Sequence, residues 1–264
     1  MTRRSGVALA LAAAMLDASI APPAEAARPL APSGLEARVR EVRLDNGMRF
    51  LLLKRGTAPV FSGILRFGVG SADDPGGETG LAHLFEHLAF KGTSRIGITD
   101  AEKENPILEA LDTTARELNA ELDRGDKADA DRLKALRAKM QQLQKDEREL
   151  VVRDEFSQIL TENGGAGINA STGTDLTSYY VSLPANRLEL WCLLESARLR
   201  DPVLREFYSE RDVVEEERRY RIDNQPQGKL YEQLLLTAYS AHPYRIPGVG
   251  WLSDLDRLTR PEAE

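Results

Sequence analysis

Residues 81–90 read LAHLFEHLAF, and at their centre His83, Glu86 and His87 form an H-x-x-E-H motif. The stretch contains no Gly or Pro and follows the breaker-rich loop DDPGGETG at residues 73–80, so we expect a helix. On a helix, residues 83 and 87 project from one face one turn apart, with Glu86 beside them. Two imidazoles so placed can bind one metal ion, and the carboxylate can serve as a general base. The order H-x-x-E-H is the inverted zincin motif.

The motif alone leaves a second interpretation open, in which His83 and His87 are surface residues that pair with Glu86. Four apolar neighbours argue against it, because they predict a largely buried helix: Leu84, Phe85, Leu88 and Phe90. A catalytic zinc site also needs a third protein ligand and an open position. The remaining histidine, His242, lies in a proline-rich loop and is a poor candidate. We therefore look for a carboxylate.

An acidic helix expected at residues 207–222 offers several carboxylates, and its periodicity selects among them. We expect Val213 and Val214 to face the core, which places Glu210 and Glu217 on the same face. An acid on the apolar side of a helix is costly unless it is paired or binds a metal. We predict that Glu217 is the third ligand and that Glu210 supports a ligand, with the exchanged roles remaining open.

Two further acids of this helix, Glu215 and Glu216, lie off the predicted buried face. We expect both to pair in solvent with neighbouring arginines, namely Arg211, Arg218 or Arg219.

The surrounding chain predicts an α+β fold, with an antiparallel or mixed sheet packed by helices. Alternating apolar residues on either side of Asp45-Asn46-Gly47 predict a hairpin at residues 39–53. Further strands are expected at 61–69 and within 168–183, and helices at 188–199 and 230–239. Strands and helices mix without a repeated strand-helix-strand unit, which excludes a doubly wound sheet.

Residues 101–160 are highly charged and predict an inserted antiparallel helical hairpin. Apolar residues recur there at spacings of three and four, as in a coiled coil: Leu108, Leu111, Ala115, Leu118 and Leu122, then Leu133, Leu136, Met140 and Leu143. We favour two solvated helices that pack only against each other over an arm that docks a partner.

The amino-terminal residues 1–26 have the pattern of a secretory signal peptide. Two arginines precede a short apolar run, and Ala24-Glu25-Ala26 forms an A-x-A cleavage site. We therefore expect export to the periplasm or secretion, a linker at 27–38 and a folded domain at 39–264. No other stretch is long and apolar enough to span a membrane.

Composition narrows the function further. The net charge of −7 disfavours nucleic-acid binding, which needs a basic surface. A single cysteine excludes an internal disulfide framework. We expect that residue, Cys192, to be a buried thiol because it lies within an apolar helical run.

Four ordered segments together resemble the pitrilysin or insulinase family of zinc metallopeptidases. They are HLFEHLAFKGT at 83–93, Asn169-Ala170 with residues 177–180, ERDVVEEE at 210–217 and HPYRIPGVGWLSD at 242–254. The branch that includes the mitochondrial processing peptidase and its bacterial relatives looks most similar. The resemblance runs from about residue 39 to 258 and is interrupted by the helical hairpin.

The resemblance implies roles for single residues. It implies one zinc ion per chain, bound by His83, His87 and Glu217, and a water activated by Glu86. It implies that Glu210 orients a ligand. It also implies that Asn169 and Ala170 contact the backbone of an extended peptide, which adds as a strand at a sheet edge.

Family members continue into a second, similar half, so the resemblance implies an N-terminal half that works with a homologous second half or partner subunit. Our leading hypothesis is a zinc-dependent endopeptidase domain that cuts peptides or unfolded proteins. The alternative is a non-catalytic or truncated homologue that acts as a peptide-binding or partner subunit. In a third interpretation the hairpin is the working part and the metal is structural. Manganese or cobalt is also compatible with nitrogen and oxygen ligands.

Overall fold

The computed structural model describes residues 34–56 and 58–264, which divide into two compact units at residue 57. The expected signal peptide and most of the expected linker lie outside the described residues. The first unit contains the short 3-10 helix η1 (Glu36–Arg38) and the strands β1 (Val39–Arg43) and β2 (Arg49–Leu53). The two strands pair antiparallel, with Val39 opposite Leu53. This confirms the predicted hairpin.

The second unit is built on a three-stranded antiparallel sheet with the strand order β3-β5-β4. Its strands are β3 (Val60–Phe67), β4 (Ala166–Thr172) and β5 (Thr177–Pro184). Leu65 of β3 lies opposite Tyr179 of β5, and Ala170 of β4 also pairs with Tyr179. The strand β4 therefore lies at an edge of this sheet, and the predicted α+β class is confirmed.

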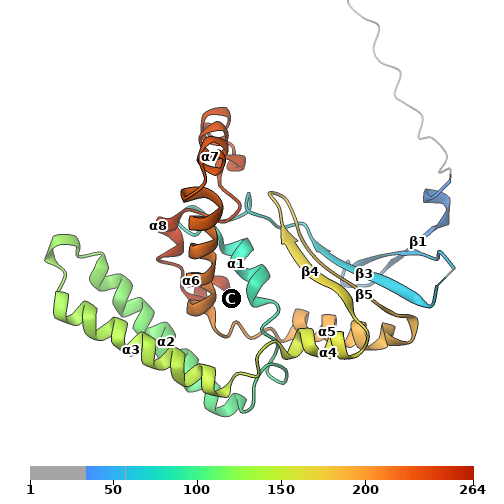
Figure 1. The fold of residues 1–264 in the computed structure, drawn as a ribbon, viewed down its shortest axis with the longest axis horizontal. Coiled ribbons are helices and arrows are strands. Elements are labelled where there is room, and N and C mark those ends of the chain that lie inside the picture. Colours follow the sequence, from blue (N-terminus) through green and yellow to red (C-terminus); the bar gives the residue numbers. More distant parts are fainter. Residues whose placement is uncertain (1–33, 57) are drawn as a thin grey trace, which may run out of the picture. The chain divides into compact units, whose positions relative to one another are not determined.

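Two helices, α4 (Glu155–Glu162) and α5 (Leu188–Arg200), cover one face of the sheet (Figure 1). The core between them is formed by Phe156, Leu160, Val181, Leu183 and Leu194. Alternate residues of β5 point into this core, as expected for a strand with one face covered. A side chain at Gly63 of β3 would meet the Trp191 ring at 2.5 Å, so this contact requires glycine.

A second core forms around helices α1 (Leu81–Leu88) and α6 (Phe207–Arg218), which lie side by side (Figure 1). Leu84, Val214 and Leu255 are fully buried in this core. After α6 the chain continues as the π-helical turn η4 (Arg219–Asp223). The remaining elements are η3 (Ala185–Arg187), α7 (Pro226–Ala238), η5 (Pro243–Arg245), α8 (Leu252–Leu255) and α9 (Arg260–Ala263).

The inserted segment forms two long antiparallel helices, α2 (Ala101–Leu122) and α3 (Ala130–Leu150), joined by the short 3-10 helix η2 (Gly125–Lys127). The predicted helical hairpin is therefore confirmed, but it ends at Leu150 rather than at residue 160, because Phe156 and Leu160 of the separate helix α4 pack in the core of the sheet. The prediction that its helices pack only against each other is wrong. Leu108 and Met140 belong to the same core as α1 and α6, and Asp112 accepts a hydrogen bond from the Tyr208 hydroxyl at 3.0 Å. The apolar residues of the hairpin therefore also pack against the core around α1 and α6.

The prediction of a buried Cys192 is also wrong, because its thiol is exposed. Helix α5 carries apolar residues on all sides, including Leu188 and Leu193, which are 51% and 63% exposed. Hydrophobic periodicity therefore cannot choose the inward face of α5, and packing of Leu194 against the sheet decides it. Among the described residues, no helix combines the length and apolarity needed to cross a bilayer.

Candidate active site

Helix α1 presents the H-x-x-E-H motif, and a carboxylate from the preceding loop holds its first turn. Asp74 accepts hydrogen bonds from the backbone amides of Gly80 at 2.8 Å and Ala82 at 2.9 Å. These amides have no partner within the helix, so Asp74 acts as its cap. Burial raises the pKa of Asp74 to about 6, against the lowering effect of the two amides.

The two histidines of α1 lie on one face, as predicted. Their ring centroids are 4.9 Å apart, and the planes meet edge to face at 80°. His83 is buried, and burial lowers its pKa to about 4, which keeps its imidazole neutral. A neutral ring is the form that binds a metal.

Helix α6 brings Glu217 to both imidazoles. Its Oε1 lies 3.8 Å from His83 Nε2, and its Oε2 lies 3.6 Å from His87 Nε2. One ligand atom from each of these three residues lies within 4.8 Å of the others. Arg221, one turn further along, also contacts Glu217 Oε1 at 2.7 Å. Two imidazoles and a carboxylate therefore converge from separate helices.

The buried face of α6 differs in part from the predicted one. Val214 is fully buried, and Glu210 and Glu217 lie one turn to either side of it, as predicted. Val213, however, is 48% exposed, so the prediction that it faces the core is wrong. The reason is geometric, since a helix turns by about 100° per residue and two adjacent residues cannot both lie at the centre of one face.

Glu215 and Glu216 also have different surroundings. Glu216 is exposed and pairs with Arg219, as predicted. Glu215 also pairs with Arg219, at 3.2 Å, as predicted. Only 7% of Glu215 is exposed, however, so the prediction that this pair lies in solvent is wrong. Burial, together with the nearby Asp256, raises the pKa of Glu215 to about 7.

Glu210 contacts one of the histidines, which is consistent with its predicted supporting position. Its Oε2 lies 3.4 Å from His87 Nδ1, and its Oε1 lies 2.6 Å from Lys91 Nζ. Burial opposes ionisation of Glu210, but the contacts with His87 and Lys91 hold the pKa of this carboxyl below its usual range. The hydrogen bond to Glu210 likewise raises the pKa of His87.

Glu86 faces the sheet edge, where Thr172 of β4 donates a hydrogen bond from its hydroxyl to Glu86 Oε2. The same strand carries Asn169, which is exposed, and Ala170, which is half-buried. The Asn169 side-chain oxygen accepts a hydrogen bond from the Ala170 amide at 2.9 Å. The predicted substrate residues therefore lie on the edge strand that contacts the helix of the motif.

The structure keeps His242 away from the histidine pair of α1. Its Nδ1 accepts a hydrogen bond from the Tyr244 amide at 3.3 Å, and its ring lies against those of Tyr239 and Tyr244. His242 is also absent from the group of converging ligand atoms. The prediction that it is a poor ligand agrees with this position.

Sequence reasoning missed two residues of the site, Lys91 and Thr172. Both lie close to motifs that were identified, Lys91 four residues after His87 and Thr172 two residues after Ala170. Their partners, Glu210 and Glu86, are far away along the chain, so no local pattern could reveal the contacts.

The donor atoms fit a zinc ion. Zinc binds imidazole nitrogen and carboxylate oxygen at about 2.0–2.2 Å, so donors of a tetrahedral site lie roughly 3.3 Å apart. The separations of 3.6 and 3.8 Å between Glu217 and the two histidines are close to that value, and one ligand atom from each of the three residues lies within 4.8 Å of the others. Three protein ligands also leave a position open, as catalytic zinc sites require.

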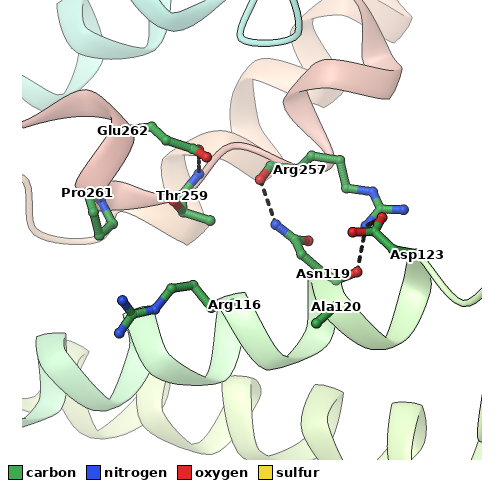
Figure 2. Close-up of a pocket in the computed structure, with 8 residues that line it drawn as sticks. All are labelled: Arg116, Asn119, Ala120, Asp123, Arg257, Thr259, Pro261 and Glu262. Carbon is green, nitrogen blue, oxygen red and sulfur yellow. Dashed lines mark hydrogen bonds and ion pairs between the residues drawn. The ribbon is translucent and has the colours of Figure 1, made fainter.

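An open pocket of about 580 Å³ lies elsewhere, between α2 and residues 257–262 (Figure 2). There the Asn119 side chain donates a hydrogen bond to the Arg257 carbonyl at 2.8 Å, and Arg257 pairs with Asp123 at 3.0 Å. None of the converging ligand residues lines this pocket. It marks the junction between the outer part of α2 and the end of the described chain.

Comparison with known proteins gives consistent matches. The profile of the family described as Insulinase (Peptidase family M16) matches residues 49–128. Zinc protease PqqE of Helicobacter pylori is 29% identical over 222 residues, which cover 83% of this chain and 37% of that protein. The chloroplastic stromal processing peptidase of Pisum sativum is 39% identical over 54 residues, or 20% of this chain and 4% of that protein.

The fold is similar to that in the crystal structure of a protease from Helicobacter pylori, with a TM-score of 0.61 and 27% identity. The match covers 85% of this chain and 41% of the other. The chain thus spans less than half the length of these relatives. Residues 49–128 thus match the insulinase (peptidase M16) family, and the similar sequences and the shared fold extend the likeness to proteases over most of the chain.

Proposed function

We propose that this chain is a zinc-dependent endopeptidase domain. The observation that carries the proposal is the convergence of His83, His87 and Glu217, whose ligand atoms lie within 4.8 Å of one another. Glu86 lies on the same helix and contacts the edge strand β4 through Thr172. The similarity to a zinc protease over 83% of the chain supports the same conclusion.

In this proposal His83, His87 and Glu217 hold one zinc ion per chain. Zinc supplies Lewis acidity, which polarises a water molecule and a peptide carbonyl. Glu86 acts as the general base: one carboxylate oxygen accepts a proton from the attacking water and delivers it to the leaving amide nitrogen. The hydroxyl of Thr172 holds the other oxygen, so the carboxylate keeps a fixed orientation.

We further propose that substrates are unfolded or extended peptides that add to β4 as a further strand. In the described sheet, β4 has β5 on one side and no strand on the other. Main-chain pairing with an edge strand tolerates many sequences, which suits a peptidase for unfolded chains. Asn169 and Ala170 would contact the peptide backbone there.

We also propose that the active enzyme contains a second half or partner subunit and that it is exported. The relatives are more than twice the length of the aligned chain, which supports a second homologous half or partner subunit in the active enzyme. The signal-like pattern of residues 1–26 supports export to the periplasm. The alternative function is a non-catalytic peptide-binding or partner subunit.

Substitution of Glu86 by Gln tests the mechanism, because the amide cannot accept the proton but keeps a similar shape. We expect Glu86→Gln to abolish cleavage of an unstructured fluorogenic peptide while zinc content stays at that of the parent chain. Glu117→Gln, at an exposed position of α2, is the matched control. Chelation should abolish the parent's activity.

The outcomes separate the two functions. Cleavage that survives Glu86→Gln would overturn the proposed base. A parent chain that binds zinc and peptide without cleaving it would favour the binding or partner subunit.

A further inference from the structure

Lys91 lies three residues beyond the end of α1, and its side chain bridges the carboxylates of Glu206 and Glu210 at the start of α6. Its ammonium group lies 2.6 Å from Glu210 Oε1 and 3.0 Å from Glu206 Oε2. Only 21% of its side chain is exposed. Burial opposes its charge, but the two carboxylates hold the pKa of Lys91 above its usual value, so the ammonium persists. Lys91 is therefore a partly buried cation with two defined partners.

The two oxygens of Glu210 have different partners. Oε1 contacts Lys91, whereas Oε2 lies 3.4 Å from His87 Nδ1. With one oxygen held by the ammonium, the carboxylate plane cannot rotate freely, and the other oxygen stays directed at the imidazole. The remaining ring nitrogen, Nε2, then faces Glu217 Oε2 at 3.6 Å. A hydrogen bond at one ring nitrogen fixes which nitrogen is free to bind a metal.

We propose that Lys91 is a positioning residue for the metal site: by holding Glu210, it fixes the ring orientation and tautomer of His87. This inference rests on the proposed function of His87 as a zinc ligand. It assigns a role to a residue that is neither a proposed zinc ligand nor part of the proposed substrate strand.

The second partner of Lys91 is held by the inserted helical hairpin. Glu206 begins α6 with a left-handed backbone conformation (φ 56°), which is strained for a residue with a side chain. Its backbone amide donates a hydrogen bond to Glu147 of α3. The preceding residue, Arg205, is fully buried and pairs with Glu104 of α2 at 2.7 Å. Both helices of the hairpin thus fix the start of α6.

This arrangement connects the hairpin to His87 through five residues in successive contact: Glu147, Glu206, Lys91, Glu210 and His87. The first contact uses the backbone amide of Glu206, and the other three join side chains. Within this series of contacts, Lys91 is the only lysine or arginine, and it lies between two glutamates. Its removal would leave Glu206 and Glu210 as neighbouring anions without a shared counter-charge, and they would repel each other.

Zinc affinity of single variants tests the role of Lys91. We expect Lys91→Met, which keeps the length of the side chain and removes the charge, to weaken zinc binding by about 10–100-fold in competition with a chromophoric chelator. Lys91→Arg should restore affinity to within a few-fold of the parent. Lys103→Met is the matched control, because Lys103 forms an exposed pair with Asp100 and should leave affinity unchanged.

A metal-free readout separates this inference from the proposed function. Long-range proton–nitrogen spectra of the histidine rings report the tautomer of His87 without zinc, and we expect Lys91→Met to change its distribution. If the parent binds no zinc, the proposed function fails, and these spectra still decide whether Lys91 fixes the ring. Thermal unfolding checks the fold, and Lys91→Gln replaces the Met variant if that variant is unfolded.

Two results would overturn the inference. The first is a folded Lys91→Met chain that binds zinc with an affinity within twofold of the parent. If the parent binds no zinc, the equivalent result is that Lys91→Met leaves the histidine spectra unchanged. The other is a Lys91→Arg chain as impaired as Lys91→Met, because the effect would then come from packing rather than from the charge.

Discussion

The hydroxyl of Thr172, on the edge strand β4, donates a hydrogen bond to the carboxylate of Glu86 on α1. The Thr172 hydroxyl oxygen lies 3.3 Å from that of Thr177 on β5, and the Thr177 O–H group donates to the Val69 carbonyl. The proposed general base is therefore tied to the same strand that is proposed to receive the substrate. Orientation of the base and docking of a peptide share one structural element.

Substitution of Thr172 should therefore affect turnover more than metal binding. We expect Thr172→Val to lower kcat by about 10–150-fold, since a lost hydrogen bond to a charged group is worth about 1.5–3 kcal/mol. Zinc content should not change, because Thr172 does not contact the ligands. Thr172→Ser should retain activity. Thr161→Val is a control, because its hydroxyl bonds only to a carbonyl of its own helix; an equal loss in this variant would argue against a specific role.

Metal content should distinguish neighbouring acids of α6. We expect about one zinc per parent chain by mass spectrometry, lost in His83→Ala and Glu217→Ala and retained in Glu216→Ala. Glu216 is the matched control, because it lies one residue away, is exposed and pairs with Arg219. Zinc lost in Glu216→Ala but kept in Glu217→Ala would reverse the assignment of the third ligand.

Stability should fall as pH rises through the range in which Glu147 ionises. Burial, aided by the charges of Glu206 and Glu104, raises the pKa of Glu147 from 4.5 to about 7, against Arg205 and the Glu206 amide. The native state thus binds an extra proton between these values. This stabilisation is fully present below about pH 4.5 and is lost as pH rises through 7, an effect of up to about 3 kcal/mol.

Glu147→Gln isolates this effect, because the amide does not titrate. We expect the unfolding free energy of the parent, measured in denaturant, to decrease more steeply from pH 5 to 8 than that of the variant. Parallel curves for the two proteins would contradict the assignment.

The ion pair between Glu104 and Arg205 should be important for stability. Both side chains are at most 1% exposed, and Arg205 also donates to the carbonyls of Lys91, Thr93 and Ile96. We expect Glu104→Ala to lower the unfolding free energy by about 3–5 kcal/mol, because it leaves an uncompensated buried charge. Lys103→Ala, which removes an exposed pair on the same helix, should leave stability unchanged. A small effect of Glu104→Ala would mean that the carbonyls alone compensate Arg205.

Much of the fold could be predicted from local patterns. The Asn-Gly turn between alternating apolar residues predicted β1 and β2, and repeated spacings of three and four predicted α2 and α3. The position of Glu217 relative to Val214 followed from helical geometry. These features depend on residues within one or two turns of each other, where periodicity is informative.

Other features depend on contacts between distant segments. Cys192 is exposed because α5 is apolar all round, so its own sequence does not identify the buried side. Glu215 is buried, and Asp256, which is far away along the chain, lies beside its carboxylate. The contact between Lys91 and Glu210 joins segments more than a hundred residues apart, and only the folded chain brings them together.

The helical hairpin leaves and rejoins the fold at nearly the same point. Just outside its two helices, Ile98 pairs with Val151, and the Thr99 amide donates to the Leu150 carbonyl at 2.9 Å. Because the exit and the return are already paired, the distance between the flanking elements does not depend on how long the excursion is. The hairpin can therefore lengthen or shorten at its tip without displacing the sheet or the histidine helix, whereas a change at its base would remove the contacts of Glu104 and Glu147 with the start of α6.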